Sequence, residues 1–157
     1  MHQDRLSYST ENCSIRRTLE IVGERWTLLI LREAFYGVRR FEDFVRLLGS
    51  PRDVLSRRLR ALVEDGILER RPYREPGSRA RTEYRLTTKG RELFPVLVAL
   101  MDWGDRWTAD PAGPAAQVIH NDCGERVSVT LACAAGHGPL SAREITVEPG
   151  PGAKLVA

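Results

Sequence analysis

The sequence predicts an α+β fold that is mainly helical, with one β-hairpin and a small β-rich C-terminal appendage. Three observations carry this prediction. Between residues 41 and 64, a short apolar-striped helix is followed by a Gly-Ser-Pro turn and a longer helix, as in a helix-turn-helix. Two strand-like segments joined by a Pro-Gly turn come next, and a long helix with a broad apolar stripe follows. This order of elements is that of a winged helix-turn-helix, in which the hairpin is the wing.

Two helices are predicted before the helix-turn-helix. Ser14 is the expected N-cap of the first helix, which ends at Gly23. The second helix spans about Glu24 to Tyr36, with Gly37 after its end. Apolar residues recur at helical spacing in both segments and mark the faces that we expect to point inward: Ile15, Leu19, Val22, Trp26, Leu29, Ile30 and Ala34.

The helix-turn-helix itself carries clear start and stop signals. Its first helix has Phe41, Phe44 and Leu48 on one face and stops at Gly49. For its second helix, Ser50 is the expected N-cap, Pro51 the first helical residue, and Asp53 the third residue after the cap. Gly66 is the expected C-terminal breaker. The residues predicted to face the core on this helix are Leu55, Leu59, Leu62 and Val63.

The segments "ILERRPY" and "RTEYRLT" are the predicted strands of the wing, and Pro76-Gly77 suits a type II turn between them. Thr87 or Thr88 is expected to cap a last helix that runs to about Thr108, with a bend near Pro95. The apolar stripe of this helix is wider than one small core requires, which predicts a homodimer. The expected dimer-interface residues are Leu97, Leu100, Trp103 and Trp107.

Positive charge is concentrated in the middle of the chain. The formal net charge is +3, yet residues 38–85 carry thirteen basic and eight acidic side chains, which gives +5 for this part alone. Such concentration predicts a polyanionic partner. No apolar run approaches the ~20 residues of a membrane-spanning helix, so we expect no membrane partner. Three scattered cysteines argue against a secreted disulfide framework, and a cytoplasmic protein is expected.

The arginines lie where a winged helix would meet duplex DNA. On the second helix of the motif, Arg57 and Arg60 point away from the leucine face, with Arg52 and Ser56 beside them. A major groove admits a helix, and arginine to guanine is the commonest specific contact. Arg39 and Arg40 precede the motif, and Arg79 and Arg81 lie on the wing, where phosphate contacts would position the helix. A single arginine is as often plain solvated surface, but three clusters on these three elements favour DNA binding.

Several motifs resemble the HxlR family of bacterial winged-helix transcriptional regulators. The resemblance covers about Cys13 to Trp107 and is carried by "CSIRRTLEIVGERWTLLILREAFYGVRRFEDFVRLL", "SPRDVLSRRLRALVEDGILERR" and "EYRLTTKGRELFPVLVALMDWGDRW". It implies a dimer that binds an inverted-repeat-like operator in double-stranded DNA. It also implies repression or activation of neighbouring genes in response to a small-molecule effector or redox stress; we expect a repressor.

Cys13 is a redox-sensing candidate. A thiol near a helix N-terminus, followed by Arg16 and Arg17, would have its thiolate favoured by dipole and charge. Relatives in the HxlR family use a cysteine at this position to sense electrophiles, although they often have proline where this chain has Ser14. The alternative is that Cys13 fills a small apolar pocket at the dimer interface.

The C-terminal extension poses a separate question. We expect residues 1–110 to form the DNA-binding and dimerisation domain and residues 111–157 to form a small β-rich extension, in which "RVSVTLA" and "REITVE" are the strands. The spacing of His120, Cys123, Cys133 and His137 would suit four zinc ligands. Gly136 stands where the second cysteine of a C-x2-C pair would fall, so the expectation is no metal and no other cofactor.

The motifs of enzymes are absent from the sequence. It has no nucleophile–base arrangement, carboxylate pair or phosphate-binding loop, so we do not expect an enzyme. The serious alternative to a DNA-binding regulator is a protein-interaction module with a winged helix and a metal-stabilised tail. That alternative predicts no duplex binding, and the arginine-lined helix speaks against it.

Overall fold

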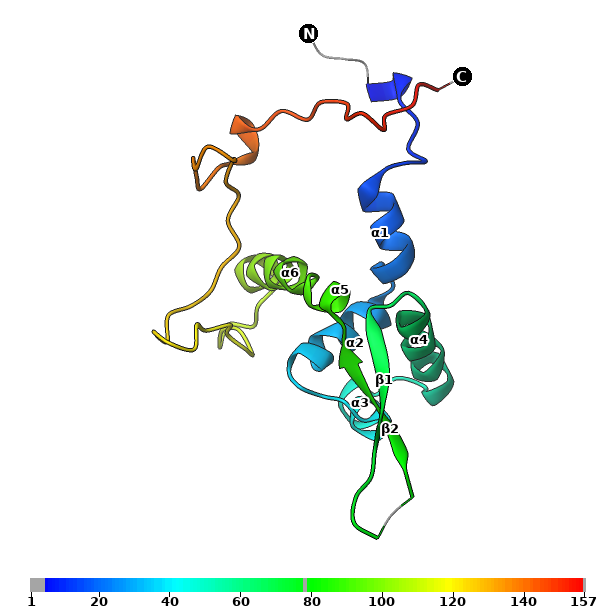
Figure 1. The fold of residues 1–157 in the computed structure, drawn as a ribbon. Coiled ribbons are helices and arrows are strands. Elements are labelled where there is room, and N and C mark those ends of the chain that lie inside the picture. Colours follow the sequence, from blue (N-terminus) through cyan, green and yellow to red (C-terminus); the bar gives the residue numbers. More distant parts are fainter. Residues whose placement is uncertain (1–4, 78, 157) are drawn as a thin grey trace. The chain divides into compact units, whose positions relative to one another are not determined.

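The structure is a computed structural model that describes residues 5–77 and 79–156. The chain forms two compact units: residues 18–97, and a second unit that joins the N-terminal residues up to Arg17 with those from Val98 onward. Figure 1 shows the order of the elements, which are η1 (Arg5–Ser7), α1 (Ser14–Val22), α2 (Arg25–Phe35), α3 (Phe41–Leu48), α4 (Arg52–Glu64), β1 (Leu68–Tyr73), β2 (Arg81–Leu86), α5 (Thr88–Arg91), α6 (Phe94–Trp107) and η2 (Ala142–Glu144).

The unit of residues 18–97 is a winged helix, as predicted. Helix α2 contacts α3, α4 and β2, and α4 also contacts β1, so three helices and one hairpin surround a single core (Figure 1). The largest fully buried side chains are the apolar residues predicted from helical spacing, together with Leu31 and the first residue of the hairpin. They are Phe44, Ile30, Leu31, Leu55, Leu59, Leu62 and Leu68.

Glycines with left-handed backbone end both helices of the helix-turn-helix. Gly49 follows α3 with φ of 60°, and Gly66 follows α4 with φ of 68°. At the end of α4, the N–H of Ile67 donates to the Leu62 carbonyl and that of Gly66 to the Val63 carbonyl, which is the Schellman arrangement. Only glycine adopts this backbone without a steric penalty, which is why both stops were readable from the sequence.

Helix α4 begins one residue later than predicted. Arg52 is its first residue, and Pro51 occupies the N-cap position with φ of −55° and ψ of 137°. Ser50 therefore lies outside the helix; its side chain is buried and its Oγ has no hydrogen-bond partner among the described residues. The prediction that Ser50 caps α4 was wrong, because Pro51 itself has an extended ψ of 137°, outside the helical region, and so takes the cap position.

The wing is the predicted two-stranded antiparallel hairpin. Leu68 faces Leu86 at its open end, and Tyr73 faces Arg81 next to the loop. An isolated bridge between Arg40 and Glu83 attaches the segment before α3 to β2, with the Tyr84 N–H donating to the Arg39 carbonyl at 2.8 Å. The loop between the strands contains Gly77 with φ of 77°, as a type II turn requires.

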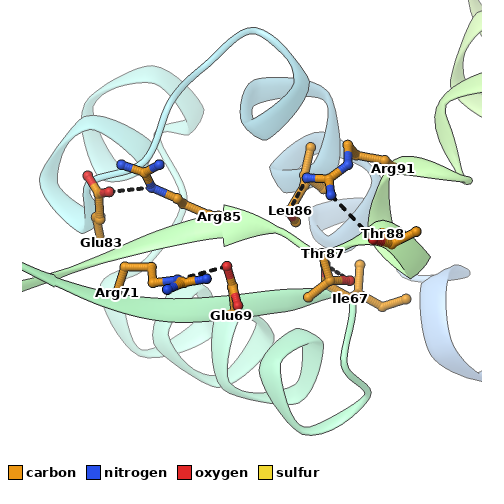
Figure 2. Close-up of polar contacts among 9 residues, drawn as sticks. All are labelled: Ile67, Glu69, Arg71, Glu83, Arg85, Leu86, Thr87, Thr88 and Arg91. Carbon is orange, nitrogen blue, oxygen red and sulfur yellow. Dashed lines mark hydrogen bonds and ion pairs between the residues drawn. The ribbon is translucent and has the colours of Figure 1, made fainter.

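Thr87 ties the end of the wing to the end of α4 (Figure 2). Its Oγ1 donates to the Gly66 carbonyl at 2.7 Å and accepts from the Gly90 N–H at 3.0 Å, so it caps α5 as well. Gly90 packs directly on this junction: a Cβ there would lie 2.2 Å from the Ile67 carbonyl oxygen. The Thr-Thr-Lys-Gly segment therefore fixes the hairpin against the end of α4.

The predicted last helix is two helices. α5 ends at Arg91, and α6 starts at Phe94 and ends at Trp107. Pro95 has no N–H to donate, and its ring would collide with the Arg91 carbonyl in a continuous helix, so the chain breaks before it instead of bending. The Leu93 carbonyl then accepts from Val96 and Leu97 and starts the new helix. In the described part of the chain, no helix has the length and apolar composition of a membrane span.

The C-terminal extension differs from the prediction. Among the described residues after α6 there is no strand; regular structure is confined to η2 and two isolated bridges, Ile119 with Arg126 and Leu155 with Tyr8. The two segments predicted as strands are irregular, and most of their apolar side chains are exposed, Val147 by 93%, while Val127 is half-buried. Alternating valines are not sufficient for a hairpin here, because most of these side chains find no apolar surface to pack on.

Candidate nucleic-acid interface

The outward face of α4 carries arginines without internal partners. Leu55, Leu59 and Leu62 are buried, so their spacing turns Arg57 and Arg60 into solvent. Neither guanidinium has a hydrogen bond or ion pair with another described residue. Ser56 lies beside them and is half-buried. The middle of this helix therefore presents two unengaged guanidinium groups, each with five N–H donors. They lie at the position from which a helix-turn-helix contacts bases in the major groove.

Arg52, at the start of α4, is held by α3. Its two terminal nitrogens donate to the two carboxylate oxygens of Glu42 at 2.8 and 2.6 Å, and its guanidinium lies 5.0 Å from the Phe41 ring centroid. These hydrogen bonds lower the pKa of the Glu42 carboxyl and raise the pKa of Arg52; the charge of Arg81 also acts to lower the former. Arg52 is thus exposed but not free.

The two arginines before α3 differ in the same way. Arg40 forms an ion pair with Glu75 at 2.7 Å and stacks on the Tyr73 ring with a centroid distance of 4.7 Å. The side chain of Arg39 is exposed and has no partner among the described residues. The backbone of this segment is fixed to β2, so Arg39 starts from a defined position beside the wing.

On the wing, two arginines are neutralised along their own strands. Arg71 pairs with Glu69 at 2.9 Å and Arg85 with Glu83 at 2.5 Å, and Figure 2 shows both pairs lying along the hairpin. Others are exposed and, within the described residues, form no hydrogen bond or ion pair; these are Arg70, Arg79 and Arg81. The paired carboxylates cancel charge on one part of the wing and leave the rest positive.

The structure thus separates the predicted contacts into two groups. Free guanidinium groups occur on all three predicted elements: the segment before α3, helix α4 and the wing. Arg40 and Arg52 are engaged by carboxylates that the sequence did not pair with them, and Arg70 was not predicted as a site residue. The strand period would not have identified Arg70, since it lies two residues from buried Leu68 and therefore on the same face of β1, yet it is exposed. No sequence signal links Glu42 to a residue ten positions away.

Cys13 is a half-buried cysteine directly before α1. The helix starts at Ser14, so the cap position belongs to Cys13 itself and not to Ser14 as predicted. The Cys13 carbonyl accepts from the Arg17 N–H at 3.0 Å. The Arg17 guanidinium reaches the Asn12 side chain at 3.3 Å, and that of Arg16 reaches Thr10 at 3.4 Å.

The residues predicted for a dimer interface divide by exposure. Leu97 is 8% exposed and belongs to the core of the winged helix. Further along α6, Leu100, Trp103 and Trp107 are 50%, 61% and 68% exposed. On α1, Ile15 and Leu19 are also exposed. The large apolar side chains on this stripe of α6 are therefore not buried by other described residues.

Free arginines on the outer face of a helix-turn-helix, beside a basic wing, define a winged-helix DNA-binding protein. Comparison with known proteins agrees. The family profile described as HxlR-like helix-turn-helix matches residues 21–111. The chain belongs to this HxlR-like helix-turn-helix family and is a DNA-binding transcriptional regulator.

Two relatives match the chain over different lengths. An uncharacterised HTH-type transcriptional regulator of Mycobacterium tuberculosis is 52% identical over 149 residues, which is 95% of this chain and 93% of the relative. A regulator of Synechocystis is 38% identical over 96 residues, or 60% of this chain and 70% of the relative. The longer match includes the C-terminal extension, and the shorter match has about the length of the winged helix.

Solved structures of similar sequence share the fold of this chain. The crystal structure of the candidate transcription factor PA1607 has a TM-score of 0.79 and 36% identity, and it covers 89% of this chain and 96% of that chain. The redox regulator HypR in its oxidized form has a TM-score of 0.56 and 31% identity, over 62% of this chain and 99% of HypR. The winged-helix fold is common to these proteins.

Proposed function

We propose that this regulator binds an inverted-repeat-like operator as a homodimer and reads the major groove with Arg57 and Arg60 of α4. The observation that carries the proposal is that both guanidinium groups are exposed and have no partner among the described residues, on a helix whose other face is buried. Bidentate arginine–guanine contacts need such unengaged forks. Ser56 lies next to them and is positioned for a further base or phosphate contact.

Phosphate contacts are assigned to the elements that flank α4. Arg39, Arg79 and Arg81 form no hydrogen bond or ion pair with a described residue, so they contribute charge to the duplex without first breaking an ion pair. Arg40 and Arg52 are proposed to contact DNA only in exchange for Glu75 and Glu42. We therefore expect Arg39, Arg79 and Arg81 to supply most of the free energy of phosphate binding, and Arg40 and Arg52 to supply less.

The homodimer is proposed to form through α6 and α1. Exposed Leu100, Trp103 and Trp107 form a stripe whose area is unfavourable in water. A two-fold axis would place two α4 helices on half-sites about one helical turn apart or a multiple of it. We assign DNA binding and dimerisation to residues 1–110 and a supporting role to residues 111–157, in a cytoplasmic protein with access to the chromosome.

Repression released by a small-molecule or redox signal is the proposed outcome of operator binding. Cys13 is the thiol proposed for a redox signal, since it lies at the start of a helix whose exposed apolar side chains are assigned to the dimer interface. A relative of known structure, HypR, is described as a redox regulator. Operator affinity is measured before and after treatment with diamide; wild type is expected to lose affinity, and Cys13→Ser is expected to keep it. An equal response of both proteins would remove Cys13 from this role.

Genomic fragments selected by the purified protein test the function as a whole. Sequencing should return a short inverted repeat, and a reporter placed behind it should fall in activity when the regulator is expressed. Arg57→Ala should weaken the enrichment, whereas Arg143→Ala, which removes an equal charge from the exposed η2 in the C-terminal extension, should not. Fragments without a common sequence would refute specific binding.

A further inference from the structure

Two histidine–cysteine pairs lie on separate turns of the C-terminal extension. His120 Nδ1 is 3.2 Å from the Cys123 Sγ, and Cys133 Sγ is 3.5 Å from the His137 Nδ1. All four residues are exposed, and both cysteines are free thiols. The DNA-binding surface uses none of these residues, so their pairing needs another explanation.

The separations match those of metal ligands. Zinc binds imidazole nitrogen at about 2.0–2.1 Å and thiolate sulfur at about 2.3 Å in a tetrahedral site, which places the two donor atoms roughly 3.5–3.6 Å apart. The Cys133–His137 pair has this separation, and the His120–Cys123 pair is slightly closer. Each pair therefore presents one nitrogen and one sulfur at the spacing of two adjacent ligands of one ion.

The turns hold these donors by their backbone. The Gly124 N–H donates to the His120 carbonyl at 2.9 Å, and Gly124 has φ of 72°. In the second turn, the Cys133 N–H donates to the His137 carbonyl at 3.0 Å, and Gly136 between them has φ of 84°. Positive φ at a glycine lets each turn fold back tightly, so histidine and cysteine meet on one side.

His120 also has a carboxylate on its second nitrogen. Its Nε2 lies 3.8 Å from the Asp122 Oδ2, while Nδ1 faces the cysteine. A ligating histidine commonly directs its other nitrogen at a carboxylate, which fixes the ring and raises its basicity. The same arrangement would make Nδ1 of His120 the better donor.

The fold of the extension gives a reason for a metal. The expectation of a metal-free tail rested on a hairpin that would bury Val129, Leu131 and Ile145, but these side chains are 39%, 55% and 41% exposed and no strand forms among the described residues there. A segment of about 40 residues seldom builds a sufficient core without a metal, disulfides or oligomerisation. The extension lacks the core that would have made a metal unnecessary.

We propose that His120, Cys123, Cys133 and His137 bind one zinc ion per chain through two nitrogen and two sulfur donors. The described residues contain no group of three or more metal-binding side chains, so the two turns are separate half-sites in this structure and the ion joins them. Thiolate and imidazole donors in a tetrahedral set select zinc. Binding releases the two thiol protons to solvent and orders the chain between the turns.

Metal content of the full-length protein, produced without a histidine tag, tests the site directly. We expect about one zinc per chain after dialysis, with the ion lost on strong chelation. Cys123→Ser and Cys133→Ser should each lower the zinc affinity at least about tenfold, while Cys13→Ser should retain the full content. A wild-type protein free of zinc, or a Cys123→Ser protein that binds as tightly as wild type, would overturn the proposal.

Cobalt replacement keeps the test valid if the variants fold poorly. In wild-type protein, Co²⁺ bound by two thiolates gives sulfur-to-metal charge-transfer absorption and the intense visible bands of a tetrahedral ion. Hydrogen exchange in residues 119–138 should slow when zinc is added and return on chelation, with residues 18–97 unchanged. Weak octahedral cobalt spectra, or exchange that does not respond to zinc, would show an adventitious surface ion and reject the site. Neither readout depends on DNA binding.

Discussion

Glu42 on α3 and Arg52 on α4 form a bidentate ion pair across the turn of the helix-turn-helix, with N–O distances of 2.8 and 2.6 Å. Both side chains are exposed, and Arg52 also stacks on Phe41. The pair therefore lies at the N-terminal end of the proposed recognition helix, where a carboxylate would repel DNA phosphates unless its charge is matched. On the proposed function, Arg52 reaches the duplex only by giving up its hydrogen bonds to Glu42.

Replacing the carboxylate should strengthen DNA binding. Glu42→Gln removes a negative charge from the surface and weakens the hold on Arg52, so we expect affinity for operator and random duplex to rise by about a few-fold, as for other exposed charge pairs. Discrimination between the two duplexes should fall. Fluorescence anisotropy titrations measure both quantities.

Asp43→Asn is the matched control for this change. Asp43 pairs with Arg46 on its own helix at 2.9 Å, so the variant removes the same charge without releasing Arg52. The two variants should therefore have different effects on operator discrimination. Equal effects from both would mean that net charge alone, and not the Glu42–Arg52 pair, determines binding.

The ion pair also predicts a pH dependence. The pKa of Glu42 is lowered from its ordinary value of 4.5, so the pair is fully formed above that value and is lost only as the pH falls through the lower pKa of the folded protein. The difference in DNA affinity between wild type and Glu42→Gln should be constant from neutral pH down to about 5 and shrink below it. A difference that already disappears near pH 6 would contradict this assignment.

Substitutions of arginines on α4 and on the wing should have different effects on DNA binding. Arg57→Ala is expected to cost roughly 1–3 kcal/mol at the operator and to relax the preference for one base, because a base contact is lost. Arg79→Ala should weaken all sequences alike and reduce the slope of log affinity against log salt by about one. Titrations at several salt concentrations on operator and random duplex separate the two. An Arg57→Ala protein with unchanged sequence preference would show that Arg57 does not contact a base in the operator.

Local signals explain which parts of the fold were predictable. The ends of α3 and α4 depend on Gly49 and Gly66, whose left-handed backbone is a property of the residue itself, and the core face of α4 follows from leucines at helical spacing. The free arginines Arg57 and Arg60 were identified correctly as outward-facing because they oppose that face. Each of these inferences needs only the residues within one or two turns.

The inferences that failed depend on contacts between distant residues. Arg52 is engaged because Glu42 reaches it once α3 and α4 are folded together, whereas no carboxylate pairs with Arg57 among the described residues. The start of α4 depended on the ψ angle of Pro51, which residue type does not fix. In the extension, alternation alone could not reveal that Val147 would find no surface to cover it. Local pattern defines the elements, and tertiary pairing decides which charges remain available.

Gly90 should be the most sensitive glycine of the wing junction. A Cβ there would lie 2.2 Å from the Ile67 carbonyl oxygen and 3.1 Å from the Leu86 Cδ2, and backbone cannot give way as a side chain can. Gly90→Ala is expected to lower the free energy of unfolding by about 1–3 kcal/mol or more. Gly104→Ala in α6 is the matched control: its nearest neighbour is 3.6 Å away, so it should stabilise by about 0.4–1 kcal/mol. Urea denaturation measures both, and equal effects would refute the close approach.

The exposed tryptophans of α6 should control oligomeric state. Trp103 is 61% and Trp107 68% exposed, so a charge at either position costs little within the chain but is unfavourable in an apolar interface. Trp103→Glu is expected to convert the proposed dimer to a monomer in light scattering at micromolar concentration and to weaken operator binding, because two half-sites are no longer read together. Leu97→Ala is the contrasting variant: it lies in the core, so it should lower the free energy of unfolding by about 2–5 kcal/mol yet leave the dimer mass unchanged in conditions where it folds. A wild-type protein that scatters as a monomer, or a Trp103→Glu protein that stays dimeric, would place the interface away from this stripe.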